Sequence, residues 1–120
     1  MAQILYIKTL CDERGDLSVI DGELGFEIKR VFYIYNVKAP RGGHAHHKTK
    51  LALICLNGSC EVKIHTLDSI TTYVLDSPRI CLILEPSEWH TMEHFTPHAL
   101  LLALASEPYS ASDYIMEKPQ

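Results

Sequence analysis

Short runs of β-forming residues, each followed by turn residues, recur about every ten positions along this chain. No long segment shows the 3.6-residue apolar period of an amphipathic helix. The spacing predicts an all-β sandwich or barrel, with strands at residues 4–10, 26–37, 51–56, 60–67, 70–75, 80–84 and 98–105. No linker or internal repeat divides the 120 residues, so residues 1–120 are expected to form a single domain.

Local patterns add detail to this expectation. Asn57-Gly58 predicts a tight hairpin turn between residues 51–56 and 60–67, because both residues tolerate positive φ angles. From 60 to 66 a mostly apolar face, Cys60, Val62, Ile64 and Thr66, alternates with a polar face, Glu61, Lys63 and His65, which predicts a strand with one buried and one exposed face. The runs LALICL, ICLIL and ALLLALA are apolar on both faces, as is typical of strands between packed layers. After Pro108 we expect only a helical turn or two, capped by Ser110 or Ser112.

Composition excludes several classes of function. Apolar residues make up 47% and charged residues 22%, a globular balance, and the net charge of −4 provides no basic surface for nucleic acid. No apolar run is long enough to cross a membrane, and the first residues lack the features of a secretory signal. Three of the four cysteines lie in apolar runs and are expected to be buried free thiols. We therefore expect a cytoplasmic protein that binds neither nucleic acid nor membranes.

The histidines point to the chemistry. Three of the seven lie within four positions, in the segment RGGHAHH at 41–47. In an extended strand His44 and His46 face the same side, where two neutral imidazoles can bind a metal or transfer protons near pH 7. Arg41 precedes His44 by three positions, and its guanidinium matches the geometry of a phosphate group.

A second motif, PSEWH at 86–90, follows about forty residues later and ends in His90. This is the order of the two motifs of a cupin barrel. In a metal cupin a Glu follows the second histidine of the first motif by four or five positions, but here Lys50 and Leu51 stand there. A three-histidine metal site at His44, His46 and His90 stays open as an alternative. We favour acid and base roles for the histidine pair in removing a proton next to a ketone.

Six blocks in order carry a resemblance that covers nearly the whole chain; they are DERGDL at 12–17, IKRVFYIY at 28–35, RGGHAH at 41–46, LICLNGSC at 53–60, WH at 89–90, and LAS at 104–106 with SDYI at 112–115. With these blocks the chain resembles the cupin-fold, WxcM-like sugar 3,4-ketoisomerases of the FdtA and QdtA type. The resemblance implies a single-domain cupin, a jelly-roll barrel with a short C-terminal tail.

The family's activity implies conversion of dTDP-4-keto-6-deoxyglucose to the dTDP-3-keto-6-deoxy sugar through an enediol. No metal or nicotinamide cofactor is implied, and the family's catalytic histidines match His44 and His46. The product leads to a 3-amino-3,6-dideoxy sugar, of the kind found in lipopolysaccharide O-antigens or S-layer glycans. Family members are homodimers that exchange N-terminal strands, so that Arg14 is expected near the substrate phosphates of the partner subunit.

Other residues are candidates for substrate binding. Tyr33 and Tyr35 share one face of a strand, where they are suited to stack on thymine or to hydrogen-bond the sugar. Arg30, on the opposite face, and the neighbours Trp89 and His90 are further candidates. His65 is expected in solvent, and His94 and His98 at the surface.

Three positions depart from the family pattern. They are Gly43, where an aromatic residue is usual, His47, where Lys is usual, and Leu51, where Gln is usual. The first is expected to widen the pocket, and the third removes a polar group close to the histidines.

Three alternatives remain at this point. A nucleotide-sugar 3,5-epimerase uses a His–Asp pair and a Tyr acid, but no acidic residue stands near His44 or His46 in the sequence. A metal cupin oxygenase would use the three histidines as ligands. A sugar-nucleotide-binding cupin would bind without turnover; the changes at Gly43 and Leu51 favour it, and the retained histidine pair does not.

Overall fold

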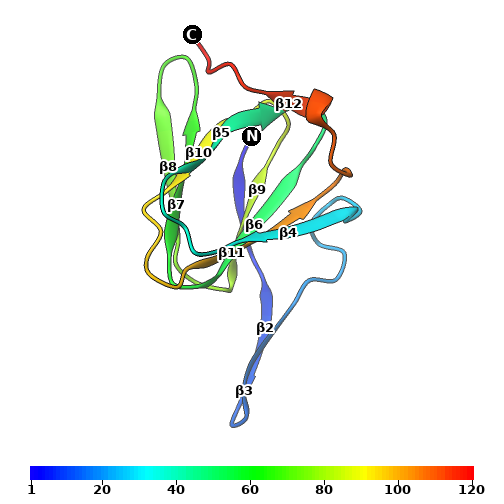
Figure 1. The fold of residues 1–120 in the computed structure, drawn as a ribbon. Coiled ribbons are helices and arrows are strands. Elements are labelled where there is room, and N and C mark those ends of the chain that lie inside the picture. Colours follow the sequence, from blue (N-terminus) through cyan, green and yellow to red (C-terminus); the bar gives the residue numbers. More distant parts are fainter.

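Two five-stranded antiparallel sheets face each other in the computed structural model, which describes residues 1–120 (Figure 1). The first sheet has the order β1 (Gln3–Tyr6), β9 (Ile80–Leu84), β6 (Leu51–Asn57), β11 (Leu100–Ala105) and β4 (Arg30–Ile34). The second has the order β12 (Tyr114–Ile115), β5 (Arg41–His46), β10 (Trp89–Glu93), β7 (Cys60–His65) and β8 (Ile70–Leu75). This double-sheet arrangement is that of a jelly roll, so the expected all-β cupin fold is confirmed.

A two-stranded hairpin and one short helical turn lie outside these sheets. The strands β2 (Lys8–Asp12) and β3 (Gly15–Val19) pair with each other and project away from the barrel (Figure 1). A single 3₁₀ turn, η1 (Ala111–Asp113), precedes β12, where the sequence predicts a helical turn. Ser110 occupies the N-cap position of this turn, although its side chain makes no capping hydrogen bond. No helix of the structure is long and apolar enough to cross a membrane.

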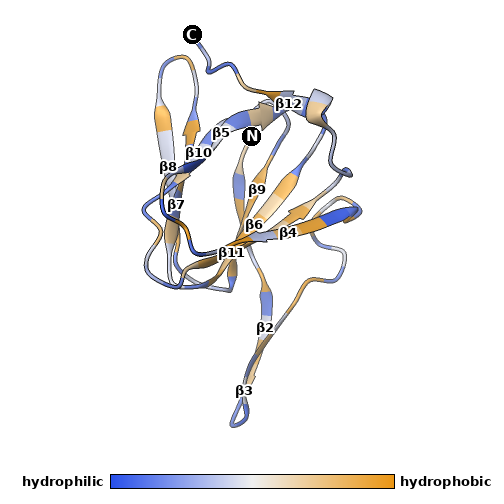
Figure 2. Ribbon diagram, viewed as in Figure 1, coloured by the Kyte–Doolittle hydropathy of each residue, from blue (hydrophilic) through white to orange (hydrophobic).

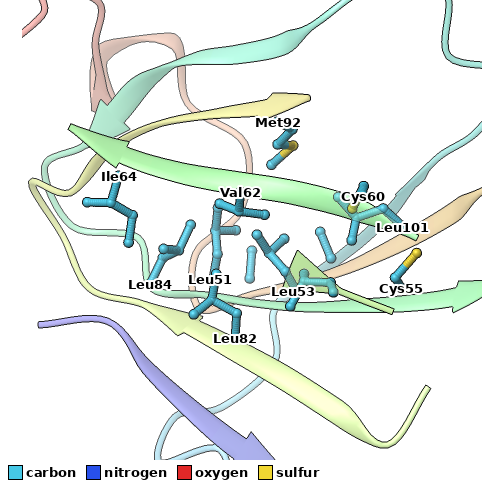
Figure 3. Packing of buried hydrophobic residues seen from close by; sticks show 13 residues of the cluster. Leu51, Leu53, Cys55, Cys60, Val62, Ile64, Leu82, Leu84, Met92 and Leu101 are labelled. Atoms are coloured by element: carbon cyan, nitrogen blue, oxygen red, sulfur yellow. The ribbon is translucent and has the colours of Figure 1, made fainter. Parts of the chain in front are cut away.

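The main core fills the space between the two sheets (Figure 3). Leu53 and Leu82 of the first sheet pack in it with Val62 of the second, and all three are fully buried. A second cluster lies on the other face of the first sheet, where Ile54 and Ile83 are covered by the loop carrying Leu24. β6 and β9 are therefore apolar on both faces because each face packs against a separate layer, as predicted. Apolar colouring accordingly follows these strands along their length (Figure 2).

Some strand boundaries differ from the prediction. Residues 4–10 form two strands that meet at the buried Ile7, whose N–H donates to the carbonyl of Arg79. β1 continues the first sheet, whereas β2 leaves it to pair with β3, which the sequence pattern does not identify. In the range 26–37 only Arg30–Ile34 is a strand. The strand β10 (Trp89–Glu93) is not predicted, because its sequence WHTME contains a single β-branched residue, Thr91.

The prediction of a hairpin at Asn57-Gly58 is wrong. β6 and β7 belong to different sheets, so the turn carries the chain from one layer to the other. Gly58 has a φ of +67°, and a Cβ there would collide with Thr96 Oγ1. The Asn57 side chain instead donates to the carbonyl of His98 at 2.9 Å. The hairpin partner of β7 is β8.

The predicted alternation along β7 is confirmed, with Cys60, Val62 and Ile64 buried. Cys55, Cys60 and Cys81 are buried free thiols, as expected. His94 and His98 are exposed, also as expected. His65, however, is not in solvent: both its ring nitrogens are buried, and its ring lies 5.1 Å from that of Trp89.

Candidate active site

A cavity of about 270 Å³ opens between the two sheets. It is lined by side chains from five strands, namely Arg30, Phe32 and Ile34 of β4, Arg41, Gly42, His44 and His46 of β5, Leu51 of β6, Met92 of β10 and Tyr114 of β12. Alternation along β5 directs His44 and His46 to the same side, as the sequence predicts. The cavity therefore combines an apolar wall with imidazoles and two guanidinium groups.

Two imidazole rings, those of His44 and His46, line this cavity, and the buried ring of His90 lies behind them. The ring of His44 lies 5.1 Å from that of His46 and 5.1 Å from that of His90. His90 is brought there by the pairing of β10 with β5, in which His90 stands opposite His44. Tyr114 of β12 lies beside the pair, with its ring 4.7 Å from His44 and 4.5 Å from His46.

Close pairing of β5 and β10 depends on a glycine. Gly42 has a φ of +84°, and a Cβ at this position would lie 2.9 Å from the carbonyl oxygen of His90. Any larger residue would push the two strands apart and separate His44 from His90. Gly42 therefore fixes the distance between the histidine-bearing strands.

His46 is bonded to a buried carboxylate. Its Nδ1 lies 3.1 Å from Oδ2 of Asp113, and both side chains are almost fully buried. The same oxygen accepts a hydrogen bond from the hydroxyl of Thr49, and Oδ1 accepts one from the backbone N–H of Lys48 at 2.8 Å. Burial raises the pKa of Asp113, but the hydrogen bonds from Thr49, Lys48 and His46 outweigh it and bring the pKa below its usual value. Asp113 is therefore an ionised acceptor.

All three site histidines are neutral near pH 7. Burial lowers the pKa of His44, and the neighbouring His46 lowers it further. Burial also lowers the pKa of His46 below its ordinary value, although the bond to Asp113 opposes the shift. Burial lowers the pKa of His90 to about 4. Neutral imidazoles have a free ring nitrogen that can accept a proton, which suits general base chemistry.

The two arginines of the cavity differ in exposure. Arg41 is exposed, at the start of β5. Arg30 is partly buried, and its guanidinium lies over the ring of Phe32 at 5.3 Å. The Nε of Arg30 is buried without a hydrogen-bond partner, so this arginine has a donor available inside the structure.

Several residues predicted for the site lie elsewhere in this chain. Tyr33 lies on the outer face of β4, opposite the cavity-lining Phe32 and Ile34, and stacks at 5.9 Å on Tyr35, just beyond the end of the strand; both tyrosines are exposed. Arg14 is 86% exposed on the projecting β2–β3 hairpin, where it pairs with Asp12.

Trp89 is also outside the cavity. It is buried on the opposite face of β10 from His90, against His65, and its Nε1 donates to the carbonyl of Met116. Gly43 lies on this same side, with Trp89 as its neighbour, so the absence of a side chain there does not widen the cavity.

Asp113 and Tyr114 are the site residues that sequence reasoning missed. No acidic residue stands near His44 or His46 in the sequence, but the inference that they have no acidic partner is wrong, because the chain returns after 67 residues to place Asp113 against His46. Both residues belong to the block SDYI at 112–115, but no local pattern links that block to the histidines.

The position of the metal-cupin glutamate is filled differently. Lys50 pairs with Glu85, their charged atoms 3.5 Å apart, and Leu51 lines the cavity wall. The structure has no group of three or more His, Cys, Asp or Glu side chains arranged to hold a metal ion.

Comparison with known proteins assigns the whole chain to a family. The sequence model of the FdtA family, described as WxcM-like, C-terminal, matches residues 1–120. The chain belongs to the FdtA family. It is 40% identical to the TDP-4-oxo-6-deoxy-alpha-D-glucose-3,4-oxoisomerase of Aneurinibacillus thermoaerophilus over 119 residues, which cover 96% of this chain and 86% of that protein.

Solved structures agree with this assignment. A double mutant of the QdtA 3,4-ketoisomerase from Thermoanaerobacterium thermosaccharolyticum, in complex with TDP, superposes with a TM-score of 0.93 at 39% identity. The match covers 97% of this chain and 87% of that one. The dTDP-4-dehydrorhamnose 3,5-epimerase of Bacillus anthracis is 20% identical, with a TM-score of 0.81 and 94% and 76% coverage, a likeness of fold alone.

Proposed function

We propose that this protein is a sugar-nucleotide isomerase that converts dTDP-4-keto-6-deoxyglucose to the dTDP-3-keto-6-deoxy sugar. A base takes the proton from C3, and the electrons of that bond form the C3–C4 double bond of an enediol. The hydroxyl proton of O3 leaves as the C3 ketone forms, and C4 and O4 each gain a proton. The reaction is an internal oxidation and reduction that balances without an external redox partner. The observation that carries the proposal is the pair of neutral histidines, 5.1 Å apart, on one wall of a cavity.

Two proton transfers need two groups, and His44 and His46 provide them. One imidazole acts as the base at the sugar carbon, and the other moves a proton between the O3 and O4 oxygens. The enediol carries developing negative charge on oxygen, which a nearby cation stabilises. Arg30 suits this role because its guanidinium lines the same cavity and its Nε has no other partner.

The nucleotide is proposed to bind outside the histidine cavity. A volume of about 270 Å³ is below the roughly 300–1,000 Å³ of pockets for drug-sized ligands, so the cavity suits the sugar ring rather than the whole dTDP-sugar. Arg41 is exposed beside it, where its guanidinium can pair with the diphosphate. This arrangement leaves the thymidine to be bound by residues beyond the cavity.

We also propose that a second copy of the chain completes the nucleotide-binding part of the site, in a homodimer with exchanged N-terminal strands. The projecting hairpin exposes Leu10 and Leu17 at more than half of their surface. The outer face of β4 and the residue just after it expose Val31, Tyr33 and Tyr35 to the same degree. Apolar surface of this kind marks protein interfaces. In such a dimer Arg14 and the tyrosines would reach the partner's nucleotide. Light scattering is expected to give twice the chain mass of 13.6 kDa.

A 3,5-epimerase is the second candidate, and one observation favours it. His46 with Asp113, beside Tyr114, forms the kind of His–Asp pair with a tyrosine that epimerases of this fold use. The two functions predict different products. Isomerisation moves the ketone to C3. Epimerisation leaves the ketone at C4 and exchanges the protons on C3 and C5 with solvent.

The histidine pair gives the direct test of the proposed function. His44→Asn and His46→Asn are each expected to lower kcat by about 10²- to 10⁴-fold, the usual contribution of a positioned acid or base. Conversion of dTDP-4-keto-6-deoxyglucose is followed by proton NMR with EDTA present, and circular dichroism checks that both variants fold. Rates like those of the unaltered protein in both variants would remove this mechanism. We place the reaction in the cytoplasm, in synthesis of a 3-amino-3,6-dideoxy sugar for a surface glycan.

A further inference from the structure

The C-terminal segment, residues 113–116, is hydrogen-bonded to both strands that carry the site histidines. Residues Tyr114–Ile115 pair with β5 opposite His46 and Ala45, which extends the second sheet across the histidine strand. The N–H of His47 donates to the carbonyl of Asp113 at 2.8 Å, and the indole of Trp89 donates to the carbonyl of Met116. The segment is thus attached to the strands that carry the histidines by backbone as well as side-chain bonds.

We infer that Asp113 is the positioning residue for His46, and that it fixes this imidazole with a proton on Nδ1 and the free electron pair of Nε2 available to the cavity. This inference rests on the proposed function, in which His46 accepts or transfers a proton. An ionised carboxylate has only acceptor atoms, so a ring nitrogen facing it must donate. Because Nδ1 faces Asp113 at 3.1 Å, Nε2 is left as the proton acceptor.

The hydrogen bonds around the Asp113 carboxylate allow only one tautomer of His46. Three donors converge on Asp113: the backbone N–H of Lys48 on Oδ1, and the hydroxyl of Thr49 with Nδ1 of His46 on Oδ2. The Lys48 N–H is fixed by the backbone and can only donate. Both oxygens of Asp113 are therefore committed to donors, and the ring of His46 is held in one orientation and one tautomer. His44 has no carboxylate bonded to it, so the two catalytic histidines are not equivalent.

Asp113→Asn changes the chemistry with almost no change in shape. The amide oxygen must face the N–H of Lys48, because the opposite orientation would place two donors against each other. The amide NH₂ then faces Thr49, whose hydroxyl can turn to accept, and His46, whose Nδ1 must lose its proton to accept. The substitution therefore moves the His46 proton from Nδ1 to Nε2, where it blocks the base.

The experiment combines a spectroscopic and a kinetic measurement. Long-range ¹H–¹⁵N NMR spectra of the unaltered protein at pH 7.5 are expected to show His46 protonated on Nδ1. In Asp113→Asn the same spectra are expected to show the proton on Nε2, and kcat is expected to fall about 10³-fold with a much smaller change in KM. Ser112→Ala is the matched control, since Ser112 lies in the same turn, is exposed and bonds only to Ser110.

Each outcome decides one claim. An Nε2-protonated His46 in the unaltered protein would overturn the inference, and this measurement does not depend on whether the variant folds. A tautomer change in Asp113→Asn with kcat unchanged would also overturn it. An unaltered protein without isomerase activity would instead refute the proposed function, while the tautomer in its spectra would still test the role of Asp113.

Discussion

Stability below neutral pH is expected to depend on His90. This side chain is 1% exposed, its Nδ1 donates to the carbonyl of Glu88 at 3.0 Å, and its Nε2 is buried without a partner. Burial lowers the pKa of His90 from 6.5 to about 4. A proton on Nε2 would have no acceptor, so the folded state resists protonation that the unfolded chain accepts.

The sign and size of the effect follow from this difference in pKa. Above pH 6.5 the imidazole is neutral in both states, so its contribution to stability is fully present. As the pH falls from 6.5 towards 4, the unfolded chain binds the proton first and the free energy of unfolding drops. The slope approaches about 1.4 kcal/mol per pH unit, and the loss between pH 7 and pH 4.5 is about 2.5 kcal/mol. The lowered pKa values of His44 and His46 act in the same direction.

His90→Asn isolates this contribution. The amide NH₂ can replace Nδ1–H as donor to the carbonyl of Glu88, but it does not titrate. Urea unfolding of both proteins is measured at several pH values from 7 to 4.5, at one protein concentration so that association is constant. The variant is expected to be less stable at pH 7 because of the space it leaves, yet to lose about 2.5 kcal/mol less on acidification. Parallel pH profiles for the two proteins would refute the reasoning.

Two further predictions concern binding and the core. Arg41→Ala is expected to raise KM for the dTDP-sugar with little change in kcat, because it removes a contact to the diphosphate that ground state and transition state share. Lys48→Ala removes an exposed cation outside the cavity and serves as the control. An unchanged KM in Arg41→Ala would contradict the phosphate role. Leu53→Ala is expected to lower the free energy of unfolding by about 2–5 kcal/mol, because Leu53 is fully buried between the sheets. Urea unfolding measures the change, and a loss below about 1 kcal/mol would mean that this core is not tightly packed.

The sequence predicted features that depend on local periodicity. The buried strands β6 and β9 and the alternation along β7 follow directly from which residues can face a packed layer. The shared face of His44 and His46 follows from the same period of two along β5. Such features need no knowledge of which strands pair.

Features that depend on long-range pairing were not predicted. Asn57-Gly58 has the local chemistry of a hairpin turn, but the strands on either side of it belong to different sheets. The turn therefore connects the two layers instead of pairing the two strands. Asp113 lies 67 positions from His46, and only the pairing of β12 with β5 brings them together. Trp89 and His90 are neighbours in sequence, yet they face opposite sides of β10, which removes Trp89 from the cavity.

The most direct test of the proposed proton transfer is the position of deuterium in the product. The purified protein is incubated with dTDP-4-keto-6-deoxyglucose in D₂O with EDTA and followed by proton NMR. The account predicts a 3-keto sugar with deuterium at C4, since the proton delivered there comes from an imidazole that exchanges with solvent. Exchange at C3 and C5 with the ketone still at C4 would show an epimerase, and binding with neither product nor exchange would show a protein that holds the nucleotide sugar without turning it over.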